Sequence, residues 1–287
     1  MGHKIANHEI GGRRDGGVIH ILNLMRELRH YQRAAVLALC LGTLLATPVL
    51  EAQDATASRA ATPPSPLRWQ DARLLGAFTL AAAAVLPIDR DGQRLMQRAW
   101  VQRSPLLSHT ADLFNAYGSP GVFVGSLGLF ATGWALQRPD IARLGLRASE
   151  TIALSGIVTG GIKGLAGRAR PYASPGRPGD FRLLSGTHDG ARQSFPSGHT
   201  TAVFAFATAL QRELRASHPQ TSRWAGPALY TAAALTGLAR MHSNDHWASD
   251  VVMGAGVGIV SGLVVARFHA DRPQHWIDQR LLPRARE

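Results

Sequence analysis

The stretch 250–268 reads DVVMGAGVGIVSGLVVARF, an apolar run in which Gly254, Gly256, Gly258 and Gly262 recur. The run has the length of a helix, and its apolar residues do not alternate with polar ones as they would in a half-buried strand. Small residues a few positions apart allow two helix backbones to approach closely. The stretch therefore predicts a helix that packs tightly against its neighbours.

Five further segments are apolar, rich in Gly and Ala, and free of strand alternation. The chain is 45% hydrophobic but only 7% aromatic, which is ample for a buried core and favours close-packed helices over a β-sandwich. We expect an all-α fold, a six-helix bundle whose functional site lies at one rim and is formed by loops and helix ends. The expected helices cover about 72–88, 116–137, 146–165, 199–211, 224–239 and 250–268.

The N-terminal region has the organisation of a secretory signal. Arg26, Arg29 and Arg33 precede the apolar run AAVLALCLGTLLATPVL, and a polar stretch rich in small residues follows it. A basic segment, an apolar segment and a small polar segment in this order direct export. The expected organisation is a signal peptide over 1–52, with Met25 as an alternative start, a linker over 53–71, a helical domain over 72–270 and a C-terminal tail over 271–287.

Export places the protein in the periplasm, either embedded in the membrane or associated with it, and we expect the site to face the periplasm. A topological conflict qualifies this expectation. If the signal is cleaved and all six helices cross the membrane, the loops that follow the third and fifth helices lie on the cytoplasmic side. Either the first helix does not cross, or the bundle is soluble or peripheral, or the signal prediction is wrong.

The chain carries a large positive excess, with 31 Lys and Arg residues against 19 Asp and Glu residues. Such a surface attracts phosphate groups. We do not expect nucleic acid as a partner, because the basic residues are scattered and an exported protein does not meet it. Only two lysines occur, Lys4 and Lys163, so a lysine kept among so many arginines indicates a need for a compact ammonium group. The single cysteine, Cys40, rules out an internal disulfide and a cysteine-based zinc site.

The first motif is KGLAGRARP, from Lys163 to Pro171. Lys163 and Arg170 are seven residues apart, so they share a face if the helix continues that far. The residue before a proline disfavours helix, which places Arg170 where the chain enters a loop. Two cations here bind an anion or merely cap a helix C-terminus.

The second motif is PSGHTTAVFAFA, beginning at Pro196. Ser197 is a favourable N-cap for the apolar helix that follows, and Gly198 lets a ligand approach the free N–H groups of its first turn. His199 adds a titratable group beside this anion site. The alternative interpretation is a capped helix with an incidental histidine.

The third motif is ARMHSNDHWASD, which contains Arg240, His246 and Asp250. His246 and Asp250 are four residues apart, so on a helix they share a face. The carboxylate can hold one ring nitrogen and direct the other at a substrate, which makes the imidazole a general base or a nucleophile. A surface His/Asp pair without function is the alternative.

Together the motifs supply three cations, a helix N-terminus, two histidines and one orienting carboxylate. This set suits phosphoryl transfer through a covalent histidine intermediate. The sequence shows neither a metal-ligand pattern nor a glycine-rich nucleotide loop, so we expect no metal and no cofactor.

The three motifs resemble the signature of the type 2 phosphatidic acid phosphatase (PAP2) superfamily, which is related to class A non-specific acid phosphatases and vanadium haloperoxidases. That signature is Lys, six residues, Arg-Pro; then Pro-Ser-Gly-His; then Ser-Arg, five residues, His, three residues, Asp. The chain matches it except that Ala239 stands where the family usually has Ser. The surrounding helices extend the resemblance to about 72–268.

The resemblance implies a role for each matching residue. His246 would be the nucleophile that accepts the phosphoryl group, and Asp250 would orient it. His199 would protonate the leaving-group oxygen and later activate water. The phosphate would be held by Lys163, Arg170, Ser197, Gly198 and Arg240.

We therefore expect a metal-independent phosphatase that acts on a phosphomonoester or pyrophosphate, with a lipid as substrate because the helices are apolar. A soluble periplasmic non-specific acid phosphatase is the main alternative; vanadium-dependent halide oxidation and non-catalytic binding of anionic lipid are the others. Polar neighbours of the motifs receive no catalytic role from the sequence: His188 and Asp189 are assigned to a solvated loop, Trp247 to packing, and His242, Asp245 and Arg168 to the surroundings of the site.

Overall fold

A computed structural model describes residues 65–283 of the chain. The expected signal peptide and most of the expected linker lie outside these residues. The described part is all-helical and forms no β-strand, which confirms the expected all-α class. Its longer helices are α2 (Trp69–Val85), α5 (Pro105–Ala116), α6 (Val122–Ala135), α7 (Pro139–Ala166), α8 (Gly198–Ser217), α9 (Pro219–His242) and α10 (Ala248–Ala270).

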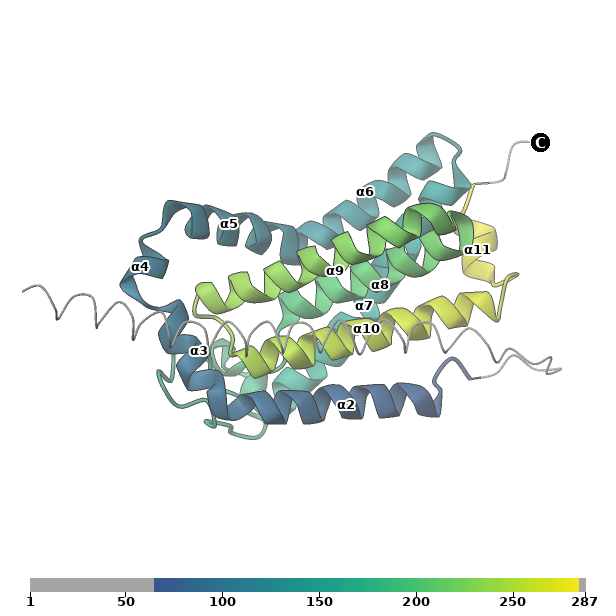
Figure 1. The fold of residues 1–287 in the computed structure, drawn as a ribbon. Coiled ribbons are helices and arrows are strands. Elements are labelled where there is room, and N and C mark those ends of the chain that lie inside the picture. Colours follow the sequence, from purple (N-terminus) through teal and green to yellow (C-terminus); the bar gives the residue numbers. More distant parts are fainter. Residues whose placement is uncertain (1–64, 284–287) are drawn as a thin grey trace, which may run out of the picture. The chain divides into compact units, whose positions relative to one another are not determined.

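Each expected apolar segment is helical, and helices that were not expected join them. These are α3 (Asp89–Met96), α4 (Ala99–Gln102), α5 and α11 (Trp276–Leu281). The sequence of α3, DRDGQRLM, is mostly polar, so hydrophobic periodicity could not reveal it. Figure 1 shows α3 and α4 at one end of the long helices, between α2 and α5.

The expected helix 116–137 is divided in the structure. Its start is a π-helical turn, η3 (Tyr117–Gly121), which follows α5 directly and contains Pro120. Proline has no N–H group to donate to the preceding turn, and this loss favours a local change of hydrogen-bond register. Helix α6 begins only at Val122.

The glycines of α10 face its neighbours at very short range. A Cβ atom at Gly254 would lie 2.7 Å from the Ser197 carbonyl oxygen, and one at Gly258 would lie 2.5 Å from the Thr201 carbonyl oxygen. These two glycines therefore let the backbone of α10 approach α8, as their spacing predicted. Gly256 faces α2, where a Cβ atom would lie 2.5 Å from Phe78.

Two buried ionic contacts show that α2 runs antiparallel to α10. Near the start of α2, Asp71 pairs with Arg267 in the last turn of α10. At the other end, Asp89, which follows α2 at the start of α3, accepts a hydrogen bond of 2.9 Å from the Ser249 N–H in the first turn of α10. The first motif ends α7, the second begins α8, and the third joins α9 to α10, so all three lie at the Asp89 end.

Two segments of the described chain have the length and hydropathy of membrane-crossing helices. They are Trp69–Met96, with a mean hydropathy of 1.5, and Ala248–Ala270, with a mean hydropathy of 1.9.

Candidate active site

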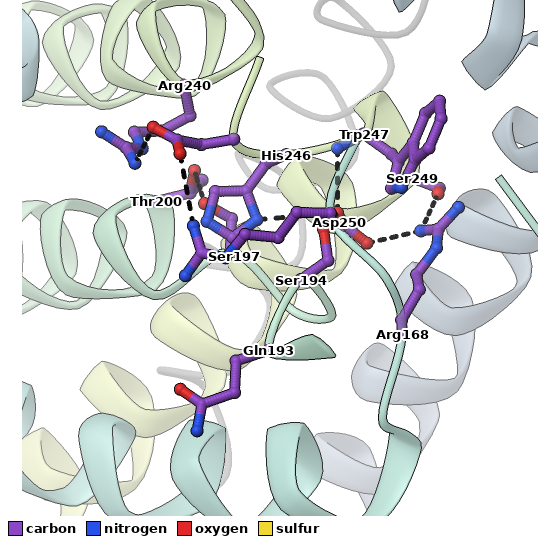
Figure 2. Close-up of polar contacts among 12 residues, drawn as sticks. Arg168, Gln193, Ser194, Ser197, Thr200, Arg240, His246, Trp247, Ser249 and Asp250 are labelled. Atoms are coloured by element: carbon purple, nitrogen blue, oxygen red, sulfur yellow. Dashed lines mark hydrogen bonds and ion pairs between the residues drawn. The ribbon is translucent and has the colours of Figure 1, made fainter. Parts of the chain in front are cut away.

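The site is built where α7 and α9 end and where α8 and α10 begin. Lys163 lies in the last turn of α7, His199 in the first turn of α8, and Arg240 in the last turn of α9. His246 lies in the loop before α10, and Asp250 in its first turn. Figure 2 shows His246 between Arg240 and Asp250, with Ser197 and Ser194 on the same side of Asp250.

His246 and Asp250 form a buried pair. The Nδ1 atom of His246 lies 3.6 Å from Oδ2 of Asp250, slightly longer than a hydrogen bond, and their side chains are 2% and 0% exposed. The same Oδ2 atom accepts hydrogen bonds from the Ser194 hydroxyl at 2.5 Å and from the Trp247 N–H at 2.9 Å. With Nδ1 facing a carboxylate, the proton of the neutral ring belongs on Nδ1, and Nε2 keeps a free lone pair.

Burial lowers the pKa of His246 to about 3, although the Asp250 carboxylate acts in the opposite direction. At neutral pH the imidazole is therefore uncharged. A neutral imidazole with an oriented Nε2 lone pair is the form required of a nucleophile.

His199 is held against the π-helical turn. A Cβ atom at Gly118 would lie 2.7 Å from Cδ2 of His199, so only glycine fits beside the ring without displacing it. Burial, and after it the charges of Arg240, Lys163 and Arg170, lower the pKa of His199 to about 4. The charges of all three cations thus act on this histidine.

Lys163, Arg170 and Arg240 form the cation cluster. The Nζ atom of Lys163 donates to the Gln193 carbonyl oxygen, and burial followed by the charge of Arg170 lowers the pKa of Lys163 to about 8. The two guanidinium groups share Asp245, whose Oδ1 atom lies 3.5 Å from Nη1 of Arg170 and whose Oδ2 atom pairs with Arg240. This contact of Asp245 with both arginines was not predicted from the sequence.

The structure changes how Lys163 and Arg170 come together. Helix α7 ends at Ala166, and Gly167 adopts a left-handed conformation with φ 54°, so the helix does not continue to Arg170 and the two cations share no helix face. Arg170 lies in a loop, as its position before Pro171 predicts. A Cβ atom at Gly167 would lie 1.8 Å from the Arg182 carbonyl oxygen, and this crowding requires glycine at the turn. Arg170 therefore reaches the site from a loop.

Ser197 occupies the N-cap position of α8, but its side chain does not cap the helix. Its hydroxyl is fully buried and accepts a hydrogen bond of 2.9 Å from the Thr200 hydroxyl instead. The next residue, Gly198, lies against Lys163, since a Cβ atom there would be 3.6 Å from Cε of the lysine. The helix N-terminus and the lysine thus lie side by side.

Several residues around the site carried little sequence signal. Asn115 of α5 accepts a hydrogen bond of 2.9 Å from Arg240. Arg168, assigned from the sequence only to the surroundings of the site, lies behind Asp250 and pairs with Asp250 and Asp89. Within the described residues, no group of three or more His, Cys, Asp or Glu side chains is arranged to hold a metal ion.

Comparison with known proteins finds a family that the region of this site resembles. Residues 144–274, which include every residue of the three motifs, match the model of the PAP2 superfamily. This stretch is similar to the PAP2 superfamily and makes up a little less than half of the chain. Helices α2 to α6 and the first residues of α7 precede the matched region.

Two similar proteins bear on this resemblance. A lipid A 1-phosphatase of Porphyromonas gingivalis is 47% identical over 72 residues, which is 25% of this chain and only 15% of that protein. The crystal structure of a transmembrane PAP2-type phosphatidylglycerolphosphate phosphatase from Bacillus subtilis matches with a TM-score of 0.53 and 19% sequence identity. It covers 72% of this chain and 99% of the other, and so shows the same fold.

Proposed function

We propose that this protein is a lipid phosphatase that hydrolyses a phosphomonoester or pyrophosphate through a phosphohistidine on His246. The observation that carries the proposal is the buried, uncharged His246, which is held beside Asp250 and lies within range of the charges of Lys163 and Arg170. A neutral nucleophile next to concentrated positive charge suits attack on a phosphorus atom whose oxygens are anionic.

In the first step, Lys163, Arg170 and Arg240, together with the first-turn amides of α8, hold the phosphate oxygens. The Nε2 atom of His246 attacks phosphorus, a P–N bond forms, and the bond from phosphorus to the leaving-group oxygen breaks. His199 donates a proton to that oxygen. Because burial lowers the pKa of His199 to about 4 in the free protein, its proton is held best when a phosphate dianion lies beside it.

In the second step, a water molecule attacks the phosphorus of the phosphohistidine. His199, which lost its proton in the first step, accepts one from this water, and the P–N bond breaks. Inorganic phosphate forms and His246 regains its lone pair. Asp250 remains ionised in both steps and stabilises the Nδ1–H side of the ring.

The outer surface of the helices supports a lipid substrate. Large apolar side chains point outward from three helices: Leu80 of α2 is 73% exposed, Val124 of α6 is 63% exposed and Ile157 of α7 is 75% exposed. Exposed apolar surface on helices that could cross a membrane suits contact with lipid. We propose a membrane-embedded six-helix bundle with the site at one rim, facing the periplasm, where a lipid phosphate in the bilayer surface reaches it.

The test is phosphate release by the full-length protein in detergent micelles. The panel contains lipid A 1-phosphate, phosphatidylglycerophosphate, phosphatidate, undecaprenyl pyrophosphate and the soluble ester p-nitrophenyl phosphate. We expect release from at least one lipid in the presence of EDTA, and loss of at least about 10³-fold in kcat for His246→Ala. His218→Ala, at the exposed turn between α8 and α9, is the matched control and should keep full activity.

Other outcomes separate the alternatives. Turnover of p-nitrophenyl phosphate without turnover of any lipid would indicate a non-specific acid phosphatase. Bromination of an organic acceptor only after addition of vanadate and peroxide would indicate a haloperoxidase, and binding of anionic vesicles with no turnover would indicate a lipid-binding protein.

A further inference from the structure

Arg168 lies on the far side of Asp250 from His246, as Figure 2 shows. Its side chain is 0% exposed, and its Nη1 group donates to Oδ1 of Asp250 and, at 2.7 Å, to the Ser249 hydroxyl. The second oxygen of Asp250 is the one that faces His246. One carboxylate thus contacts an arginine through one oxygen and the candidate nucleophile through the other.

Asp89 holds the opposite side of the same arginine. Its Oδ2 atom accepts hydrogen bonds from Nη2 of Arg168 at 2.8 Å and from the Ser249 hydroxyl at 2.5 Å. Its Oδ1 atom accepts one of 2.9 Å from the Ser249 N–H. Asp89 is 1% exposed, and it lies outside the region that matches the PAP2 family model.

A buried carboxylate that is ionised needs a cation or several hydrogen-bond donors, because removal from water is costly. Here two such carboxylates share one guanidinium, whose planar donors can engage both at once. Backbone contacts hold the arginine in place as well: its Nε and Nη2 groups donate to the Pro178 carbonyl oxygen at 2.9 Å and 2.7 Å. This arrangement fixes the orientation of Asp250.

We propose that Arg168 and Asp89 are positioning residues that act through Asp250 to orient His246, an inference that rests on the proposed phosphohistidine mechanism. Neither residue contacts the substrate. Arg168 keeps Asp250 ionised and prevents its rotation, so that Oδ2 stays directed at Nδ1 of His246. Asp89 and Ser249 hold the guanidinium of Arg168 in the orientation that lets it contact Asp250.

Rate and pH profile together test this proposal. The double variant Arg168→Met/Asp89→Leu removes both charges, so neither residue is left as an uncompensated charge by loss of the other. Asp250 loses its arginine but keeps the hydrogen bonds from Ser194 and Trp247. We expect kcat to fall about 100-fold with little change in KM, because misplacement of a reacting group by about 1 Å has an effect of that order. Arg168→Lys should lose less, since an ammonium group keeps the charge but cannot engage both carboxylates.

The pH at which kcat/KM rises on the acid side of the profile (its acid limb) gives a second measurement. A variant that is merely less stable would not shift this pH. This limb rises as His246 loses its proton. Without Arg168, the negative charge of Asp250 acts on His246 uncompensated and favours the imidazolium, so the limb should move to higher pH.

The matched control is Arg267→Met/Asp71→Leu, which removes a buried ion pair between the same two parts of the chain at the opposite end of α10. Thermal unfolding should show a comparable loss of stability in both double variants, while the control keeps the wild-type kcat and pH profile. If the Arg168/Asp89 variant is folded and also keeps kcat and its acid limb, the positioning role is overturned although the phosphatase proposal stands. If the wild-type protein releases no phosphate from any substrate, the proposed function itself fails.

Discussion

At the scale of single residues, Asp245 is the most informative side chain of the unliganded site. Its two oxygens contact Arg170 and Arg240, the same groups that we propose hold the phosphate. The carboxylate offsets the repulsion between two neighbouring guanidinium groups, and it competes with an incoming anion for them. Its charge should therefore set how tightly the site binds phosphate.

Asp245→Asn is expected to tighten binding of inorganic phosphate about tenfold. The amide keeps the size of the side chain but removes a negative charge that opposes a dianion at a distance of a few ångströms, an interaction of about 1–4 kcal/mol. The inhibition constant of phosphate against lipid hydrolysis measures the change. Asp91→Asn, on the exposed side of α3, is the control and should leave the constant unaltered; weaker binding in Asp245→Asn would show that the carboxylate serves only to order the arginines.

The charge of Lys163 should make phosphate binding depend on pH in the alkaline range. Burial and the charge of Arg170 lower its pKa to about 8, so it is a cation below that pH and becomes neutral above it. The inhibition constant of phosphate should rise severalfold between pH 7.5 and about pH 9.5 as the cation is lost. Lys163→Arg stays charged throughout this range, and in that variant the rise should disappear.

At the scale of elements, α5 and the π-helical turn support the site from the side. Asn115, near the end of α5, accepts a hydrogen bond from Arg240 and donates one of 2.8 Å to Ser243. Gly118, within the turn, lies directly against the ring of His199. A shift of this element would therefore move Arg240, which we propose binds phosphate, and the candidate acid together.

Gly118→Ala tests this support. The added methyl group would lie 2.7 Å from Cδ2 of His199, closer than van der Waals contact allows, so the ring must move. We expect kcat to fall by about 10- to 100-fold while phosphate binding changes little. Gly125→Ala in α6 has open space around its new methyl group and is the control; equal activity of the two variants would show that the position of His199 tolerates the displacement.

At the scale of the whole molecule, the direction of α2 is decisive for topology. It determines whether a cleaved signal peptide is compatible with a site that faces the periplasm. Asp71 lies at the end away from the site and Asp89 at the site. If the bundle crosses the membrane, Asp71 and the site are on opposite sides. A periplasmic site then requires Asp71 to be cytoplasmic, which is incompatible with export of the segment before α2 by a cleaved signal.

Cysteine labelling in intact cells decides between these topologies. In a Cys40→Ser background, we place one cysteine at Arg177, in the exposed loop near the site, and another at Gln220, at the exposed start of α9. With the proposed periplasmic site, a membrane-impermeant maleimide should label Arg177→Cys and not Gln220→Cys. The reverse pattern would favour the signal peptide and place the site in the cytoplasm, and labelling of both would indicate a bundle that does not cross.

Much of this protein follows from local sequence. The long apolar helices are recognisable because their length and their lack of strand alternation are typical of buried helices, and α10 packs as the spacing of its glycines predicts. The pairing of His246 with Asp250 follows equally from a four-residue spacing at a helix start. These features depend on residues within a turn or two of each other.

Tertiary structure alone decided what the neighbouring arginines do. Arg168 and Arg170 are two residues apart, yet Arg168 is buried behind Asp250 while Arg170 faces Asp245 in the cation cluster. The left-handed turn at Gly167 directs the chain out of α7, and the loop after it determines which guanidinium points inward. Asp89 reaches Ser249 across 160 residues of sequence, and a contact of that kind depends on how distant helices pack, which no local pattern records.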